Sequence, residues 1–402
     1  MSFNQLAFRL KRLYLEASFY LYVEETKVAK KLIPDYLDKL QVYQAGKPIE
    51  EVAREKGLTH ISKLASNENP LGPSPFAIRE MTSALWDIHR YPDMHATDLK
   101  NKLCELYKVK PANIILGNGS EGIMAYIARA FIQPGDEVLT ADKTFIGFHI
   151  LATSAGAKLV TCPRTEDMKY DVKALAKAVN ENTKVLYIAN PDNPTGSYIT
   201  EKEFDYLMQF VPKHTIVILD EAYFEFAQST WDYPDSMKYR YDNVITLRTF
   251  SKAYGLSGIR VGYGFAHENF ITALHKVKLP FEPNLIAQKG AIGALTDYPH
   301  LERTIRNNTK RYYETLKFLD HRNFKPLRST TNFICFYTGS EEASDFLFNK
   351  LLDRGVIIRP LKANKLPDWV RVSIGLKEEM KHFFEAMDEV LPEYNQKFRP
   401  DQ

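Results

Sequence analysis

The sequence predicts an α/β protein whose larger domain is a doubly wound sheet, followed by a smaller α+β domain. Three observations support this prediction. Between about residues 76 and 250, strand-length segments rich in Val, Ile and Leu alternate with helix-length segments. Short strands of this composition, separated by helices, indicate a mostly parallel sheet that is covered on both faces. After about residue 290, the alternation gives way to two long helices and a few strands, which predicts a second packed unit.

The expected elements follow one another along the chain. In the larger domain, helices are expected at residues 76–88, 96–109, 120–131, 145–156, 171–180 and 201–212. Strands are expected at residues 112–117, 136–141, 157–163, 183–190, 215–223 and 243–250. In the smaller domain, the two long helices precede strands at 330–338, 355–361 and 369–375, with one helix after the first strand and a final helix at the end.

An arm is expected before the larger domain. Its second part, residues 61–75, is so rich in Pro, Gly and Asn that a long helix or central strand is excluded, which leaves an ordered loop or disorder. We therefore divide the chain into an N-terminal extension of unknown role (1–32), the arm (33–75), a large domain (76–290), a small domain (291–395) and a tail (396–402).

Composition and charge exclude several classes of function. The chain has 402 residues, of which 53 are basic and 50 acidic, so its net charge of +3 argues against a nucleic-acid-binding face. The three cysteines lie far apart without a C-x-x-C pair, which supports neither a disulfide framework nor a zinc site. The apolar runs are strand-length and broken by charge, so no membrane span is expected. Residues 1–32 lack the cleavage site of a signal peptide. These observations predict a cytoplasmic protein with no metal site.

The segment Thr249–Tyr263, TFSKAYGLSGIRVGY, carries the strongest chemical signal. Lys252 lies among apolar residues, where burial disfavours the ammonium form and leaves an amine that can condense with an aldehyde. Ser251 and Arg260 supply a hydroxyl and a guanidinium, which together can hold a phosphate. A phosphorylated aldehyde bound through lysine describes pyridoxal phosphate. An isolated Ser-Lys pair is more often a surface lysine in a glycine-rich loop, so the assignment depends on further segments.

One further segment, Gly117–Gly122 with the sequence GNGSEG, lies between a strand and a helix. Its small residues let the backbone approach a ligand, and the helix N-terminus offers free N–H groups to a phosphate. It also matches G-x-G-x-x-G, with Asp142 following at the end of the next strand, so an NAD-dependent dehydrogenase is an alternative. That alternative leaves Lys252 without a role.

Other candidate residues follow strand ends, where ligands bind in open α/β sheets. Asp220 could keep a pyridine nitrogen protonated, although a turn cap is the commoner role of a strand-end aspartate. Tyr223 could donate to a ring oxygen or be an ordinary half-buried tyrosine. Asn193 stands in the rigid turn Asn190–Gly196, which could serve as a platform or merely as a turn. Phe145 could stack on a flat cofactor or pack in the core.

The combination of segments resembles a known family. N-P-x-N-P-T-G, then V-I-L-D-E-A-Y, then T-F-S-K-A-Y-G-L-S-G-I-R-V-G-Y is similar to the fold-type-I pyridoxal-phosphate-dependent aminotransferases. Within that superfamily, YQAGKPIEEV, KLASNENPLGPSP, RYPD, NIILGNGSEGI, VIIRP and VRVSIG resemble the histidinol-phosphate aminotransferases. The resemblance covers roughly residues 33–395 and implies a large domain with a mostly parallel seven-stranded sheet. The N-terminal extension has no counterpart, and Lys143 stands where many relatives carry proline.

The resemblance implies roles for the matching positions around the cofactor. Lys252 would bond to pyridoxal 5′-phosphate and then move a proton between the substrate's Cα and C4′ of the cofactor. Asp220 would pair with the pyridinium nitrogen. The remaining cofactor contacts implied are Asn193 and Tyr223 at the ring hydroxyl, Phe145 stacked on the ring, and Ser120, Glu121, Ser251 and Arg260 around the phosphate.

The resemblance also implies an obligate homodimer with shared sites. Tyr91 of RYPD would reach the phosphate from the neighbouring subunit, and the arm would pack with the small domain and the partner subunit. Arg371 would bind the carboxylate of glutamate, and Arg359 would join it in holding a substrate phosphate. Tyr43 and Asn67, from the arm, would line the substrate pocket.

The implied reaction is transamination between histidinol phosphate and 2-oxoglutarate, giving imidazole-acetol phosphate and glutamate. Aromatic aminotransferases share nearly all of these motifs, and a phosphothreonine decarboxylase uses the same scaffold, so both remain alternatives. A non-catalytic regulator built on this fold carries a DNA-binding domain in front, for which the N-terminal extension is too short.

Overall fold

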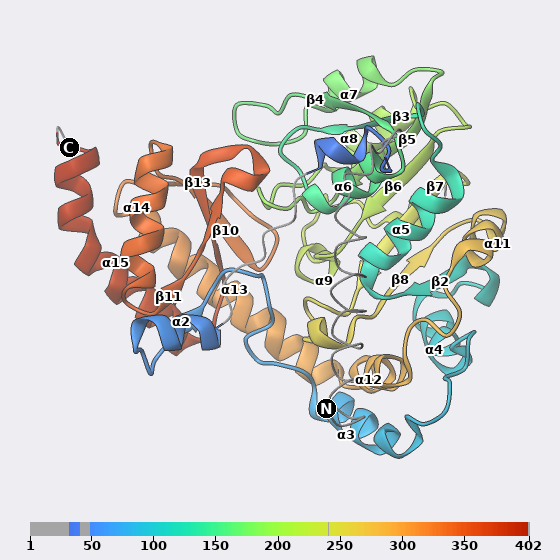
Figure 1. Cartoon of the computed structure of the whole chain (residues 1–402), viewed down its shortest axis with the longest axis horizontal. Helices are drawn as coiled ribbons and strands as arrows, with labels where there is room; N and C mark the ends of the chain where they lie inside the picture. The colour runs from blue at the N-terminus through green and yellow to red at the C-terminus, as the bar shows by residue number, and fades with distance from the viewer. Residues whose placement is uncertain (1–31, 41–48, 240, 401–402) are drawn as a thin grey trace, which may run out of the picture. The chain divides into compact units, whose positions relative to one another are not determined.

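A seven-stranded sheet with the order β2-β8-β7-β6-β5-β3-β4 organises most of the chain in the computed structural model (Figure 1). Its strands are β2 (Ile114–Gly117), β3 (Glu137–Ala141), β4 (Lys158–Cys162), β5 (Thr183–Ala189), β6 (Ile216–Asp220), β7 (Val244–Thr249) and β8 (Gly262–Phe265). Strand β8 pairs antiparallel with both β2 and β7, and the other pairings are parallel. The predicted mostly parallel seven-stranded sheet is confirmed.

The structure describes residues 32–40, 49–239 and 241–400. Two compact units are distinguished, residues 1–41 and residues 42–402. In the first, the described element is the 3-10 helix η1 (Leu37–Lys39). All the elements below belong to the second.

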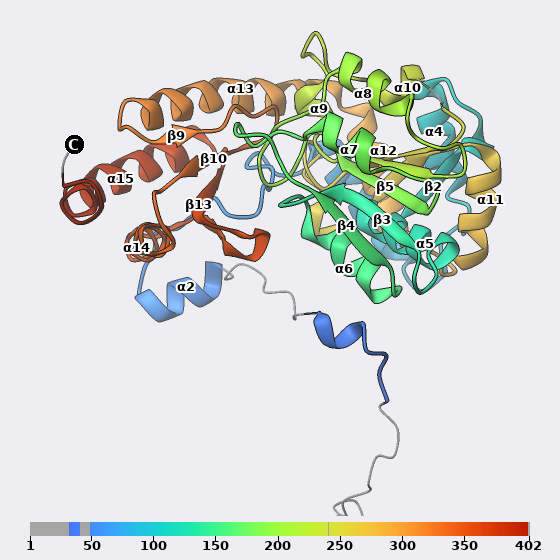
Figure 2. The same cartoon turned by 90° about the horizontal axis from the view of Figure 1, so that it is seen from above.

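Helices cover both faces of the seven-stranded sheet because successive strand residues point in opposite directions. On β6, Ile216 and Ile218 pack with α5 (Gly119–Phe131), α6 (Ile146–Ser154) and α11 (Glu268–Val277). Their neighbours Val217 and Leu219 pack with α7 (Val172–Ala178) and α8 (Glu201–Met208) on the other face, as Figure 2 shows. Further helices around this sheet are α3 (Pro75–Ala84), η2 (Leu85–Asp87), α4 (Thr97–Tyr107), η3 (Pro111–Asn113), α9 (Phe224–Ala227), α10 (Ser236–Tyr239), η4 (Ser257–Ile259) and α12 (Leu285–Thr296).

Strand β8 was not among the predicted strands, because two of its four residues are glycines, which are depleted in strands. Close packing explains them. A Cβ atom on Gly262 would lie 2.4 Å from the backbone nitrogen of Ser120, and one on Gly264 would lie 3.0 Å from the carbonyl oxygen of Thr246. The glycines therefore let β8 insert between β2 and β7.

A second, antiparallel sheet has the order β12-β13-β10-β9. Its strands are β9 (Lys325–Pro326), β10 (Phe333–Tyr337), β12 (Arg359–Leu361) and β13 (Leu366–Ser373), with η5 (Lys362–Asn364) between the last two. The helices α13 (Tyr298–Asp320), α14 (Glu341–Leu352) and α15 (Lys377–Phe398) pack with it around one apolar core. The α+β character predicted for this part of the chain is confirmed, and the predicted domain boundaries stay a prediction.

Two predictions on local structure were wrong in detail. The expected strand at 355–361 is divided into β11 (Val356–Ile357) and β12, which belong to different sheets. Within the segment 61–75, which was expected to be an ordered loop or disorder, β1 (Ser62–Lys63) pairs parallel with β11. Helix α2 (Ile49–Lys56) packs nearby through Val52 against Ile357. The reason is that a two-residue strand needs little periodicity, so sequence pattern does not reveal it.

Candidate active site

The carboxyl ends of β5, β6 and β7 and the start of α5 surround a cavity of about 140 Å³. It is the place where the structure brings most of the predicted residues together, as expected for an open α/β sheet. The predicted residues that line it are Ser120, Glu121, Phe145, Asn193, Asp220, Tyr223, Ser251, Lys252 and Arg260. Ala189, Pro191, Ala222 and Thr249 complete the lining.

Lys252 lies just beyond the end of β7, with part of its side chain open to the cavity. Its Nζ atom is 3.4 Å from the carbonyl oxygen of Ser66 and 5.7 Å from the centre of the Tyr223 ring. Burial lowers the pKa of Lys252 to about 8, and the positive charges of Arg371 and Arg260 act in the same direction. A substantial fraction of this side chain is therefore a neutral amine near pH 8, as a nucleophile or a base requires.

Asp220 is buried at the end of β6, and one of its two carboxyl oxygens accepts a hydrogen bond. Its Oδ2 atom accepts a hydrogen bond of 2.9 Å from the Tyr187 hydroxyl, and its Oδ1 atom has no hydrogen-bond partner in the described structure. Burial raises the pKa of Asp220 to about 7, against the opposing effects of Tyr187 and the backbone of Ala222. A buried carboxyl with an open oxygen favours a cationic partner such as a protonated ring nitrogen.

The groups expected to hold a phosphate form a cradle at the start of α5. Arg260 donates from Nη1 to the Ser251 hydroxyl at 3.2 Å, and the Thr249 hydroxyl donates to the same oxygen at 3.0 Å. Gly119 has φ +79°, and a Cβ atom there would lie 2.7 Å from Nη2 of Arg260. No larger residue could let the guanidinium approach the helix N-terminus so closely. Asn118, at the N-cap, makes no side-chain bond to the helix.

The candidate substrate-binding residues Arg371 and Asn67 do not line the cavity themselves but contact Asn193 and Tyr223, which do. Arg371 donates to Oδ1 of Asn193 at 2.6 Å and to the carbonyl oxygen of Ala65 at 2.9 Å. Asn67 has φ 56° and donates from Nδ2 to the Tyr223 hydroxyl at 2.9 Å. Strand pairing places Arg359 directly opposite Arg371, so the structure brings the two predicted arginines together.

Tyr91, the residue expected to act in the neighbouring subunit, does not line the cavity of its own chain. Tyr91 is 81% exposed, and its ring stacks on Phe281 with the ring centres 4.2 Å apart. Tyr43 lies outside the described residues. Asp142, which the dehydrogenase alternative required, does not line the cavity and instead forms an ion pair of 3.6 Å with Lys365.

Three supporting residues were missed by the sequence analysis. Tyr187, on β5, holds Asp220. Asp192 and Arg164 form a fully buried ion pair of 2.9 Å beneath the turn that carries Asn193. Arg164 also donates to the carbonyl oxygen of Asp142 at 2.8 Å, so it ties the loop before Phe145 to that turn. Asp192 was visible as the variable position of the N-P-x-N-P-T-G segment, but no local pattern points to Arg164.

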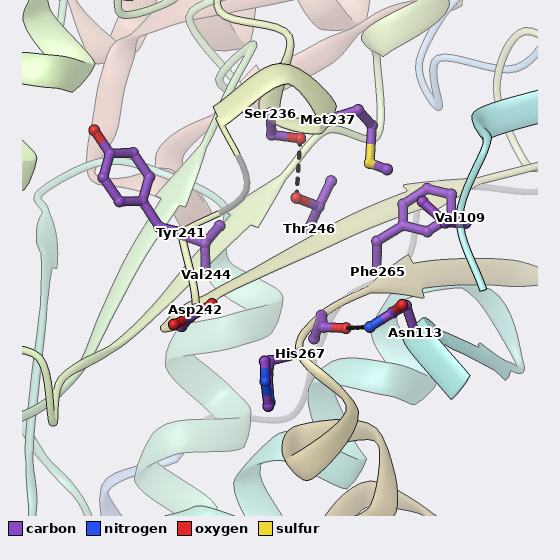
Figure 3. A pocket seen from close by; sticks show the side chains of 11 residues that line it. Val109, Asn113, Ser236, Met237, Tyr241, Asp242, Val244, Thr246, Phe265 and His267 are labelled. Carbon is purple, nitrogen blue, oxygen red and sulfur yellow. Dashed lines mark hydrogen bonds between the residues drawn. The ribbon is translucent and has the colours of Figure 1, made fainter. Parts of the chain in front are cut away.

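A second cavity, of about 150 Å³, lies at the amino end of β7 (Figure 3). None of the predicted residues lines it. Among its polar groups, Thr246 donates to Ser236 at 2.9 Å and Asn113 donates to the carbonyl oxygen of Ala266 at 2.9 Å. The cavity around Lys252, with its open Asp220 oxygen, is therefore the better candidate for chemistry.

Comparison with known proteins identifies the class. Residues 59–387 match the family model described as aminotransferase class I and II. The chain belongs to this family and is an aminotransferase, which also excludes the dehydrogenase alternative. Among the described residues, no group of three or more metal-ligating side chains is close enough to hold a metal ion, and no helix has the length and apolarity needed to cross a membrane.

Individual proteins similar to this chain are named as histidinol-phosphate aminotransferases. The chain is 40% identical over 357 residues to "Histidinol-phosphate aminotransferase 2" of Carboxydothermus hydrogenoformans, covering 88% of this chain and 98% of that protein. It is also 40% identical over 359 residues to the histidinol-phosphate aminotransferase of Akkermansia muciniphila, covering 88% and 97%. The crystal structure of the Sinorhizobium meliloti histidinol-phosphate aminotransferase in complex with pyridoxal-5′-phosphate superposes with a TM-score of 0.82 at 28% identity, covering 92% of this chain and 100% of that chain. The resemblance drawn from the sequence motifs is confirmed.

Proposed function

We propose that the chain is a pyridoxal-phosphate-dependent aminotransferase that moves an amino group between histidinol phosphate and 2-oxoglutarate. The observation that carries the proposal is the single cavity in which a lysine of lowered pKa, a buried carboxyl with an open oxygen and a phosphate cradle lie together. The names of the relatives support the choice of histidinol phosphate.

The residues present fit pyridoxal phosphate. The backbone N–H groups of Ser120 and Glu121 are at the free N-terminus of α5, and Arg260 and Ser251 stand beside them, so an anion is favoured there. Asp220 would pair with the ring nitrogen through its open oxygen. Asn193 and Tyr223 would contact the ring hydroxyl, Phe145 would cover a ring face, and Lys252 would form the covalent bond.

When bound, pyridoxal phosphate supplies an electron-withdrawing ring that stabilises negative charge at the substrate's Cα. Side chains of this protein supply proton transfer, orientation and rigidity. Lys252 holds and returns a proton at Nζ, for which a pKa of about 8 is suited. Tyr187 orients the Asp220 carboxylate and stabilises its charge. The ion pair of Arg164 and Asp192 keeps the turn under Asn193 rigid.

Two arginines on neighbouring strands fit a site that must accept two kinds of anion. Guanidinium groups bind planar carboxylates and tetrahedral phosphates through paired N–H donors. Arg371 is oriented by Asn193 and Ala65, so it would bind the carboxylate shared by glutamate and 2-oxoglutarate. Arg359, opposite it on β12, would contribute to holding the phosphate of the other substrate.

The working enzyme in this proposal is a cytoplasmic homodimer. Tyr91 and Trp86, 81% and 86% exposed, are large apolar side chains of a kind that a partner subunit would cover. Tyr91 would then reach the cofactor phosphate of the partner, and Tyr43 would line the substrate pocket. The free thiols of Cys104, Cys162 and Cys335 support a reducing compartment.

A spectrum of the purified protein before and after addition of histidinol phosphate tests the proposal. We expect yellow absorbance that bleaches as the cofactor accepts the amino group, and restoration by 2-oxoglutarate. Bleaching by phenylalanine or tyrosine but not by histidinol phosphate would favour the aromatic aminotransferase alternative. Release of carbon dioxide from threonine phosphate would favour the decarboxylase.

A further inference from the structure

The segment between α11 and α12 contacts the start of the phosphate-binding helix through one carboxylate. Oε1 of Glu282 accepts a hydrogen bond of 2.7 Å from the side-chain amide of Asn118. Its other carboxyl oxygen accepts from the hydroxyl of Tyr126, which lies further along α5 and is buried. Glu282 therefore bridges the N-cap residue of α5 and a residue within the same helix.

Asn118 would otherwise compete with a phosphate. Because α5 begins at Gly119, the second and third residues of the helix are Ser120 and Glu121. An N-cap asparagine normally accepts a hydrogen bond from the N–H group of one of those two positions, and it is among the best residues for doing so. These are the N–H groups that the proposed function assigns to the cofactor phosphate. In this structure Asn118 makes no such cap, and its amide is turned to Glu282.

The segment that carries Glu282 is held from several sides. Asn284 caps α12 by accepting from the N–H of Ala287 at 2.9 Å and donates to the carbonyl oxygen of Ile259 at 3.2 Å, next to Arg260. Gln288 donates to the carbonyl oxygen of Pro283 at 2.9 Å. Glu282 is thus fixed relative to the phosphate cradle, so its carboxylate can act as a permanent acceptor for Asn118.

We propose that Glu282 is a positioning residue for cofactor binding, which keeps Asn118 off the N-terminus of α5 and so leaves two backbone donors open to a phosphate. The proposal rests on the proposed function, because it takes pyridoxal phosphate as the ligand. It predicts an effect on the phosphate alone, since neither residue lines the cavity around Lys252.

The test compares two probes, pyridoxal 5′-phosphate and pyridoxal, titrated into apoenzyme and followed by absorbance. In Glu282→Ala, Asn118 is released, and we expect pyridoxal phosphate to bind about five- to tenfold more weakly, the size of one N-cap interaction. Pyridoxal, which has no phosphate, should bind as it does to the wild type. Glu282→Gln keeps an acceptor for Asn118 and should remain within about twofold of the wild type. Tyr126→Phe removes the other hydrogen bond to Glu282 but leaves the acceptor of Asn118 in place. Its affinity for pyridoxal phosphate should therefore also remain within about twofold of the wild type.

A second substitution in the Glu282→Ala background gives the decisive result. Asn118→Ala removes the competing side chain, so the double variant should regain most of the lost affinity for pyridoxal phosphate. If Glu282→Ala does not fold, Asn118→Ser supplies the same information, because serine is a strong and uncharged N-cap residue without an amide to donate to Glu282, and it should again weaken pyridoxal phosphate but not pyridoxal. Equal losses for both probes, or no recovery in the double variant, would overturn the proposal. A wild-type apoenzyme that binds neither probe would instead remove the proposed function.

Discussion

The hydroxyl of Tyr187 donates to Oδ2 of Asp220 at 2.9 Å, while the other carboxyl oxygen of Asp220, a residue that lines the cavity, has no hydrogen-bond partner in the described structure. This arrangement assigns one oxygen to the hydrogen bond with Tyr187 and leaves the other for the proposed bond to the cofactor. Tyr187 also stacks on Phe148, with the ring centres 4.4 Å apart, so its ring is fixed independently of the hydrogen bond.

Tyr187→Phe should therefore keep the packing and lose the bond. A hydrogen bond to a charged group contributes about 1.5–3 kcal/mol, so we expect kcat to fall about tenfold or more. The pKa of Asp220, already raised by burial, should rise further because Tyr187 lowers it. Steady-state kinetics with a pH profile checks this; an unchanged kcat at all pH values would contradict the role given to Tyr187.

Lys252→Ala should abolish both the yellow absorbance and turnover. Lys278 offers a matched control, because burial lowers its pKa to about 8 as well, yet it does not line the cavity. Lys278→Ala should keep the absorbance. Absorption spectra of the two variants show which lysine carries the cofactor. Turnover retained by Lys252→Ala would rule out the reactive role assigned to Lys252.

The buried ion pair of Arg164 and Asp192 should matter far more for stability than an exposed one. Arg164→Ala leaves a buried carboxylate without its partner, and we expect the free energy of unfolding to fall by about 3–5 kcal/mol. The exposed pair of Lys350 and Glu393, at 2.7 Å, provides the comparison, and Lys350→Ala should change stability by less than about 1 kcal/mol. Urea denaturation of both variants measures the difference. Similar losses would mean that burial does not control the energetics of the first pair.

The buried carboxyl of Glu225 should make the stability of the folded protein depend on pH, independently of catalysis. It is 4% exposed, neither carboxyl oxygen has a hydrogen-bond partner in the described structure, and burial raises its pKa to about 7 from 4.5. A raised pKa means that the folded state binds the proton more tightly, so this contribution to stability is complete below pH 4.5 and is lost as the pH rises through 7. Glu225→Gln should match the wild type near pH 4.5 and be more stable at pH 8, by roughly 1–3 kcal/mol. Thermal unfolding of the apoenzyme at both pH values checks the sign; a variant less stable at pH 8 would contradict it.

Replacing Arg359 and replacing Arg371 should affect KM for the two substrates differently. Arg359→Ala should raise KM for histidinol phosphate about tenfold or more, while changing KM for 2-oxoglutarate much less. Arg371→Ala should raise KM for both substrates, because the Arg371 guanidinium also orients Asn193. Initial rates with each substrate varied in turn provide the measurement. Equal effects of Arg359→Ala on both substrates would remove its assignment to the phosphate.

The sequence predicted those parts of the site that follow strand ends. Asp220 and Lys252 lie just where buried strands stop, and the topology of a parallel sheet brings such positions to one edge. Arg164 could not be found in this way, because its contact with Asp192 joins separate loops and leaves no periodic signal. Sequence pattern likewise missed β8, since packing against Ser120, and not strand propensity, selects Gly262.

The segment between β7 and β8 leaves the sheet at Thr249 and returns beside the same strand at Gly262. It carries both Lys252 and Arg260, the proposed attachment points for the two ends of the cofactor. An insertion or deletion between Thr249 and Gly262 would change the distance between Lys252 and Arg260, so it would impair both proposed cofactor contacts. Arg359 on β12, the residue proposed to hold the substrate phosphate, lies outside this segment, so we expect substitutions there to change substrate preference while leaving the distance between Lys252 and Arg260 intact.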